Sequence, residues 1–214
     1  MRSESSPVGQ EATRTFTETA RRAQIVAAAI DTIAELGYGQ ASLARIAETA
    51  GTSKGVIIYH FGGKDELMRE LVAEVVARGV AYMEPQVDAE PTGAGKLRAY
   101  IESNLAFMGE NRNHMVAIFE IALNARAADG SRLYDVSVQD AGVAALEQLL
   151  AYFQGTGEFR AGFDPHVMAM AIRAAINAVP AQLARDPAFD VAHHAREIAD
   201  MFHIATRPGS QPVP

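Results

Sequence analysis

The chain has 214 residues, of which 49% are hydrophobic, and it contains neither cysteine nor tryptophan. A chain of this length and composition can bury a core, which excludes global disorder. The lack of cysteine excludes disulfides and thiolate metal sites and fits a reducing cytosol. The first fifteen residues are polar, without the apolar stretch of a signal peptide, and no uninterrupted run approaches the roughly 18 apolar residues of a membrane span. We therefore expect a cytoplasmic protein without a membrane partner.

The charge is unevenly distributed along the chain. Residues 14–64 carry six basic and four acidic residues, a net charge of +2, while the remainder carries 13 basic and 22 acidic residues, a net charge of −9. A mildly basic segment on an acidic body is typical of a DNA-binding head joined to a domain with another task.

Helical periodicity runs through the whole chain, without the alternating pattern of strands. The first three predicted helices are bounded by capping residues and glycines. A capping box of Thr15 and Glu18 starts the first helix, with Thr17 as the alternative cap. The other expected caps and breaks are, in chain order, Gly37, Ser42, Gly51, Thr52 or Ser53, and Gly62.

The remaining helices are longer. One begins at Lys64 and is expected to stop at Pro85, with residues 86–95 as a loop. An Asp164–Pro165 pair starts an alanine-rich helix through residue 181, which Pro180 kinks or ends early. The other helices are expected over about 97–108, 113–127, 131–154 and 191–205. The sum is an all-α fold of about nine helices.

The organisation that follows is a three-helix head on a larger helical body. We expect a flexible tail over residues 1–14 and a helix-turn-helix domain over 15–63. An effector-binding and dimerisation domain over 64–206 and a second flexible tail over 207–214 complete the chain.

The most informative spacing lies in residues 43–61. Two short helices can cross at the angle of a helix-turn-helix when small residues line their contact, and Ala47, Gly51 and the inward-facing Ile57 meet this need. The next helix begins Thr52–Ser53–Lys54–Gly55, where two hydroxyls, a cation and an open backbone suit a phosphate backbone.

These residues resemble the TetR family of regulators. The resemblance covers residues 21–71, about a third of the chain, and rests on Gly37–Tyr38, Ser42–Leu43, Ile46–Ala47, Ala50 to Gly55, Tyr59–His60–Phe61 and Lys64 to Leu67. In that family the first three helices bind DNA, and the remainder dimerises and holds a small effector that usually releases the DNA. The resemblance therefore implies a ligand-responsive repressor on a palindromic operator, without catalytic activity.

The predicted DNA contacts lie on the second and third helices and at the start of the fourth. Their alternative roles are helix capping and an ordinary solvated face; Ile58 either meets a thymine methyl group or is buried. The residues are Ser42, Arg45, Thr52, Ser53, Lys54, Gly55, Ile58, Tyr59, His60 and Lys64.

The effector pocket is expected among the helices of the body, as a mostly apolar cavity with a few polar groups. Plain core packing is the alternative for each candidate. Glu120 interrupts an apolar run, so it is either a buried pocket residue or a rim glutamate that faces water. The candidates are Tyr100, Asn104, Phe107, Met108, Phe119, Glu120, Asn124, Tyr134, Met168, Arg173 and Asn177.

Alanines between residues 169 and 181 permit close approach of helices, so the last two helices are expected to form a homodimer interface; internal packing is the alternative. No cofactor is expected. No metal site is expected either, because the adjacent His193 and His194 point about 100° apart on a helix. Two rival functions remain: a small-molecule carrier whose helix-turn-helix no longer reads DNA, and an enzyme.

Overall fold

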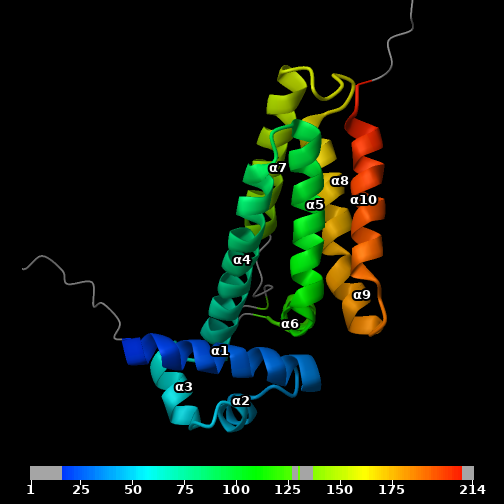
Figure 1. Ribbon diagram of the computed structural model, residues 1–214. Coiled ribbons are helices and arrows are strands. Elements are labelled where there is room, and N and C mark those ends of the chain that lie inside the picture. Colours follow the sequence, from blue (N-terminus) through cyan, green and yellow to red (C-terminus); the bar gives the residue numbers. More distant parts are fainter. Residues whose placement is uncertain (1–15, 127–129, 131–136, 209–214) are drawn as a thin grey trace, which may run out of the picture.

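The computed structural model describes residues 16–126, 130 and 137–208, and these residues form ten α-helices. α4, α5, α7, α8 and α10 stand roughly side by side as an upright bundle, with α6 lying across its lower end and the short α9 also at that end (Figure 1). α1 crosses the same end and carries α2 and α3 beneath it. This confirms the predicted all-α fold with an N-terminal head. The helices are α1 (Phe16–Leu36), α2 (Leu43–Thr49), α3 (Lys54–Phe61), α4 (Lys64–Ala89), α5 (Gly93–Glu110), α6 (Arg112–Asn124), α7 (Ser137–Gly155), α8 (Pro165–Asn177), α9 (Val179–Arg185) and α10 (Val191–Thr206).

Local sequence signals set most of the helix ends. The side chains of four N-cap residues accept a hydrogen bond from the backbone N–H three residues further on, as the sequence predicts. These residues are Ser42, Ser53, Asp164 and Asp190. Gly51, with φ of +60°, makes the turn between α2 and α3 in a conformation that other residues rarely adopt.

Pro85 does not end its helix, and that prediction is wrong. α4 continues to Ala89, and α5 already begins at Gly93, so most of the expected loop is helical. A proline removes one backbone hydrogen bond, which is a limited loss near an exposed helix end. In the same turn the side-chain amide of Gln86 donates to the Tyr82 carbonyl at 2.8 Å.

Pro180, in contrast, lies at a real break. α8 ends at Asn177 and α9 begins at Val179, so that the proline occupies the first turn of the new helix, where its missing N–H is harmless. One predicted helix is therefore two.

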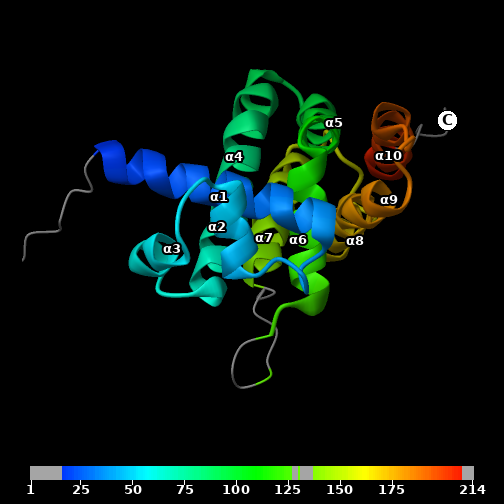
Figure 2. The ribbon, with the colours of Figure 1, turned by 90° about the horizontal axis from the view of Figure 1, so that it is seen from below.

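The head and the body share α1. α1 packs on α2 and on α6, and its Arg22 contacts the end of α3, so that a single apolar core runs from the head into the body. Seen from below, α2 and α3 lie in front of α1 on the side away from the bundle (Figure 2). The surface of α2 and α3 is thereby left free for a partner.

Residues 165–185 are long and apolar enough to span a membrane by length and composition alone. They are nevertheless divided at Ala178 and carry Arg173, α8 packs on α7, and Ala169, Ile172 and Ile176 are buried. The outer face of α8 exposes Val167 and Met170. The outer face of α8 is therefore an apolar surface that no described residue of the monomer covers.

Candidate nucleic-acid interface

The contact between α2 and α3 is built as the spacing predicts. Ile46, Ala47 and Ile57 are buried, and the Thr52 N–H donates to the Ala47 carbonyl at 2.9 Å across the turn. The side chain of Gln24 on α1 donates to the Ala50 carbonyl at 2.9 Å. The two short helices are thus fixed to each other and to α1.

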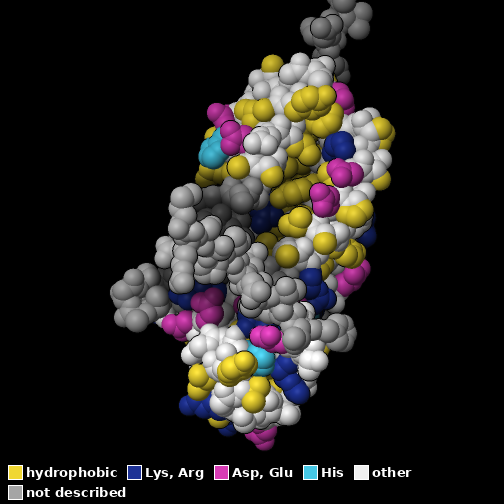
Figure 3. Space-filling view, turned by 90° about the vertical axis from the view of Figure 1, so that its left-hand side faces the viewer, with side chains coloured by type: hydrophobic (Ala, Val, Ile, Leu, Met, Phe, Trp, Pro, Cys, Tyr) yellow, Lys and Arg dark blue, Asp and Glu magenta, His cyan; other side chains and the backbone are white. Residues whose placement is uncertain are grey.

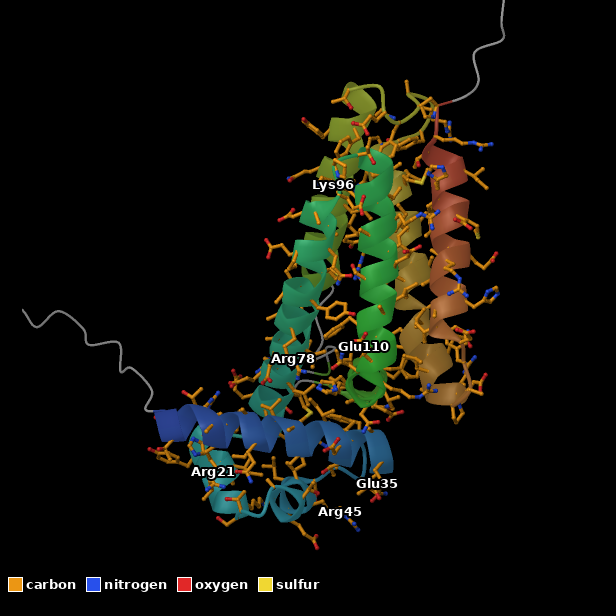
Figure 4. All side chains as sticks on the ribbon, in the orientation of Figure 1. Arg21, Glu35, Arg45, Arg78, Lys96 and Glu110 are labelled. Atoms are coloured by element: carbon orange, nitrogen blue, oxygen red, sulfur yellow. The ribbon has the colours of Figure 1, made fainter. Side chains whose placement is uncertain are left out.

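The outer surface of this pair carries the predicted contact residues. Arg45, Lys54 and Gly55 are exposed, and Figure 4 shows Arg45 at the end of the molecule opposite the body. Tyr59 is 81% exposed and Ile58 is 42% exposed, so Ile58 is not buried. Ile58 and Tyr59 are neighbours, so the outer face of α3 presents an exposed apolar side chain beside an exposed aromatic one.

Two predicted contacts are also caps. The Ser42 hydroxyl accepts from the Arg45 N–H and the Ser53 hydroxyl from the Val56 N–H, each at 3.3 Å, and both residues are exposed. Capping uses one lone pair of the oxygen and leaves its proton available. The capping role and a phosphate contact are therefore compatible. Thr52 is half-buried beside them.

Two other predicted contacts point partly into the head. Lys64 donates from Nζ to the Tyr38 carbonyl at 2.8 Å and lies over the Tyr38 ring, 3.9 Å from its centroid. Burial lowers the pKa of Lys64. His60 is half-buried between Tyr59 and Phe61, and its Nδ1 is buried without a hydrogen-bond partner among the described residues. These two side chains help to hold the head together, and their contact with DNA stays a prediction.

Arg22 on α1 joins three elements of the head. Its Nε donates to Oε1 of Glu70 on α4 at 3.0 Å, Nη2 donates to the other oxygen of that carboxylate, and Nη1 donates to the His60 carbonyl at the end of α3. The guanidinium also stacks on Phe61, 4.2 Å from the ring centroid. Arg22 is 7% exposed, so these contacts form a buried ionic clamp between α1, α3 and α4. Sequence reasoning missed it, although an arginine in register with Ile25, Val26 and Ala29 on the buried face of α1 was a signal.

The joint between head and body contains Glu120. Its Oε2 accepts the Tyr38 N–H at 3.1 Å, just after the end of α1, and the side-chain amide of Asn124 at 3.2 Å. Glu120 is half-buried at this position, and its place in the effector pocket stays a prediction. α6 holds the loop that leads from α1 to α2.

A histidine lies at the same joint. Nε2 of His114 on α6 is 3.2 Å from Nη1 of Arg78 on α4, and Asp31 on α1 is near enough to influence its charge. Burial lowers the pKa of His114, and the positive charge of Arg78 lowers it further, whereas Asp31 acts in the opposite direction.

This shift predicts a pH dependence of stability. The unfolded chain takes up a proton near pH 6.5, before folded His114 does, so the free energy of unfolding should fall as the pH falls from 6.5 through the lower pKa of the folded state. Thermal unfolding between pH 5 and 8 checks this. His114→Gln should flatten that part of the profile, while His193→Gln on exposed α10 should leave it unchanged. An identical slope in His114→Gln and wild type would contradict the assignment.

The body brings together part of the predicted pocket. Arg173 on α8 donates to the Tyr100 hydroxyl on α5 at 3.2 Å and to Oδ1 of Asn177 at 3.1 Å. Asn104, Phe107 and Met108 continue along α5 and are buried; Phe119 and Met168 are half-buried. Tyr134 lies outside the described residues. Asn124 is exposed beside Glu120 at the joint, apart from this group.

Two grooves flank α5. One, of about 490 Å³, is lined by Arg78, Ala81, Tyr82, Phe107, Glu110 and Asn111. The other, of about 430 Å³, lies further along α4 and α5 and includes Ser103 and Glu102. Figure 4 shows Arg78 and Glu110 on the lower halves of α4 and α5. Phe107 is the one predicted pocket residue that either groove includes.

Comparison with known proteins identifies the head. Residues 25–71 match the family model of bacterial regulatory proteins, tetR family. The HTH-type transcriptional regulator BetI 1 of Chromohalobacter salexigens is 34% identical over 85 residues, which are 39% of this chain and 42% of that protein. The fatty acid metabolism regulator protein of Bacillus subtilis is 30% identical over 90 residues, 42% of this chain and 46% of that protein. The matches thus span less than half the length of these relatives.

The fold extends the likeness over the body. The crystal structure of the transcriptional regulator FadR from Bacillus subtilis, in complex with stearoyl-CoA, superposes with a TM-score of 0.73 at 22% identity, over 84% of this chain and 96% of that one. At this identity the superposition establishes the fold alone. The head, over residues 25–71, therefore matches the tetR family of bacterial regulatory proteins, and the whole chain has the fold of a solved transcriptional regulator.

Proposed function

We propose that the chain is a cytoplasmic, dimeric transcriptional regulator, a repressor that leaves a palindromic operator when a small molecule binds its body. The relatives that match the head are named as transcriptional regulators, and none of those described above is named as an enzyme. The solved regulator with the same fold is in complex with a small molecule, stearoyl-CoA.

The observation that carries the proposal is the outer face of α3. Tyr59 and Ile58 are exposed there beside Lys54, although both are residues that a protein normally covers. A Cβ on Gly55 would meet nothing nearer than the Ser53 hydroxyl, at 3.7 Å, so packing within the head does not require glycine here. An open backbone beside a cation and a tyrosine suits close approach to DNA.

We assign α3 to the major groove, with phosphates contacted from α2 and from the turn before α3. Tyr59, Ile58 and Lys54 reach base edges and the groove wall. Lys64 has N–H donors beyond the one on the Tyr38 carbonyl, and these supply a phosphate contact at the groove edge. The full set is Ser42, Arg45, Thr52, Ser53, Lys54, Gly55, Ile58, Tyr59, His60 and Lys64.

The dimer forms through the outer faces of α8 and α10. α8 exposes Val167, Met170 and several alanines, and α10 exposes Met201 and Ile204. Two copies related by a two-fold axis would cover both apolar faces in a four-helix arrangement. Such a dimer presents two α3 helices to successive major grooves.

The effector binds between α5, α7 and α8, around Tyr100, Asn104 and Arg173. α6 and Glu120 pass its effect to the head, because Glu120 contacts the chain just after α1. Linkage then requires operator DNA to weaken effector binding by the same factor by which the effector weakens DNA binding.

The test is titration of the purified protein onto the DNA that flanks its own gene, with scrambled DNA of the same length as control, at two salt concentrations. Selective binding that weakens with salt is the expected result. Tyr59→Ala should lose about tenfold or more in affinity, since a good base contact contributes roughly 1–3 kcal/mol. Tyr152→Ala removes another exposed tyrosine, from α7, and should bind as wild type does.

Equal affinity for both DNAs at every salt concentration, with no effect of Tyr59→Ala, would contradict the proposal that α3 binds operator DNA. A body that still retained a small molecule in that case would favour the carrier.

A further inference from the structure

We propose that Arg173 is the anion-binding group of the effector site, and that the effector is an amphiphile with one carboxylate on an apolar body. This inference rests on the proposed function and specifies the chemistry of its ligand.

The guanidinium of Arg173 lies between three helices. It projects from α8, donates to Tyr100 on α5 and packs against α7, where a Cβ on Gly142 would lie 3.4 Å from its Nε. Nε is buried and has no hydrogen-bond partner among the described residues. The glycine allows the charged group to lie close to the backbone of α7.

The partners of Arg173 do not neutralise it. Of the five N–H donors of a guanidinium, one is bonded to the Tyr100 hydroxyl and one to the Asn177 amide oxygen, both uncharged. Arg98, on the same body, binds the carboxylates of Glu102 and Asp200. No described carboxylate forms an ion pair with Arg173. A largely covered charge without a counter-ion is costly, so an arginine placed in this way indicates an anion that comes from outside the chain.

Polar groups next to the guanidinium are also available. The Tyr100 oxygen accepts from Arg173, and no described residue accepts the hydroxyl proton in turn. Asn104, one turn further along α5, is 7% exposed, and no hydrogen bond of its side chain links it to a described residue. The guanidinium, the phenol and the amide together can donate to the oxygens of one carboxylate.

The residues around Arg173 indicate that the remainder of the ligand is apolar. Phe107 and Met108 follow on α5, and Ile172 and Ile176 flank Arg173 on α8. On the face of the body where α4 and α7 lie, the surface is hollowed and hydrophobic side chains gather around the hollow (Figure 3). One guanidinium matches a monoanion, whereas a phosphate dianion would bring a second charge for which Arg173 offers no partner.

The experiment measures binding of decanoate and 4-phenylbutyrate to the full-length protein by calorimetry and by thermal unfolding, without DNA. The matched probes are 1-decanol, which lacks the charge, and decyltrimethylammonium, which reverses it. We expect at least one carboxylate to bind and to raise the melting temperature, with the alcohol and the cation at least tenfold weaker. Arg173→Met should lose at least tenfold in carboxylate affinity, and Arg173→Lys should recover part of it.

Arg185→Met on α9 is the control, because Arg185 is an exposed arginine that lies outside the proposed site. Without ligand, Arg173→Met should melt no lower than this control, since it removes a half-buried charge that has no counter-ion among the described residues. A lower melting temperature would assign Arg173 a structural role and overturn the proposal. Binding of decanol as tight as that of decanoate, or the absence of binding by both carboxylates, would overturn it as well.

Operator binding by ligand-free wild type and Arg173→Met separates the two proposals. If the protein binds its operator but neither carboxylate, the anion site is rejected and the proposed function stands. Carboxylate binding by a protein that does not select its operator rejects the regulator alone.

Discussion

Arg22→Ala is expected to abolish operator binding by loosening the head while the body stays folded. The substitution removes the guanidinium that holds Glu70 of α4 and the His60 carbonyl at the end of α3, and it leaves the half-buried carboxylate without its partner. Breaking a buried ion pair from one side costs about 3–5 kcal/mol, a large part of the stability of a domain. The lost stacking on Phe61 adds to this.

Hydrogen exchange of backbone amides measures the effect where it occurs. Protection should fall in α1, α2 and α3 and stay near wild type in α5 and α10. The matched control is Arg21→Ala, because Arg21 is the neighbouring arginine and its side chain bonds to Gln24 at the surface. If Arg22→Ala bound operator as Arg21→Ala does, the clamp would contribute little to the head.

Met170→Glu is expected to convert a dimer into monomers. Met170 is 53% exposed on the apolar outer face of α8, and in a two-fold interface each copy would bury a carboxylate against an apolar helix. The mass in solution should fall from about twice 22.9 kDa to 22.9 kDa, as sedimentation or light scattering would show. Operator affinity should fall with it, because one head then binds one half-site.

Val80→Glu provides the comparison for this experiment. Val80 is 50% exposed on α4, away from α8 and α10, and its substitution should leave the dimer intact. A monomeric wild type, or a Met170→Glu variant that keeps the dimeric mass, would exclude the proposed interface.

The sequence predicts the local architecture of this molecule well. Caps such as Ser53 and Asp164, and the turn glycine Gly51, act through neighbours within a few residues, so their effect can be read from the chain itself. The exposed face of α3 follows from the same short-range pattern. Pro85 shows the limit, because a proline near an exposed helix end removes only one backbone hydrogen bond, and α4 continues past it to Ala89.

Contacts between distant segments could not be predicted in this way. Glu120 meets Tyr38, 82 positions earlier in the chain, and periodicity carries no information about such a partner. Lys64 likewise fits a phosphate contact by sequence, while its Nζ bonds to the Tyr38 carbonyl. The pairing of Arg173 with Tyr100 needed the packing of α8 near α5, although both residues stood out as polar groups in apolar helices.

Because α4 is long, a small rotation of this helix produces a large displacement of the head. With 26 residues the helix is about 39 Å long, and it runs from the head at Lys64 to a far end that contains Pro85. A rotation of about 5° around that far end shifts the near end by about 3.4 Å, which is about the rise of one base pair. In the proposed dimer both heads would move. A tilt of this size would then change the spacing of the two α3 helices relative to successive major grooves.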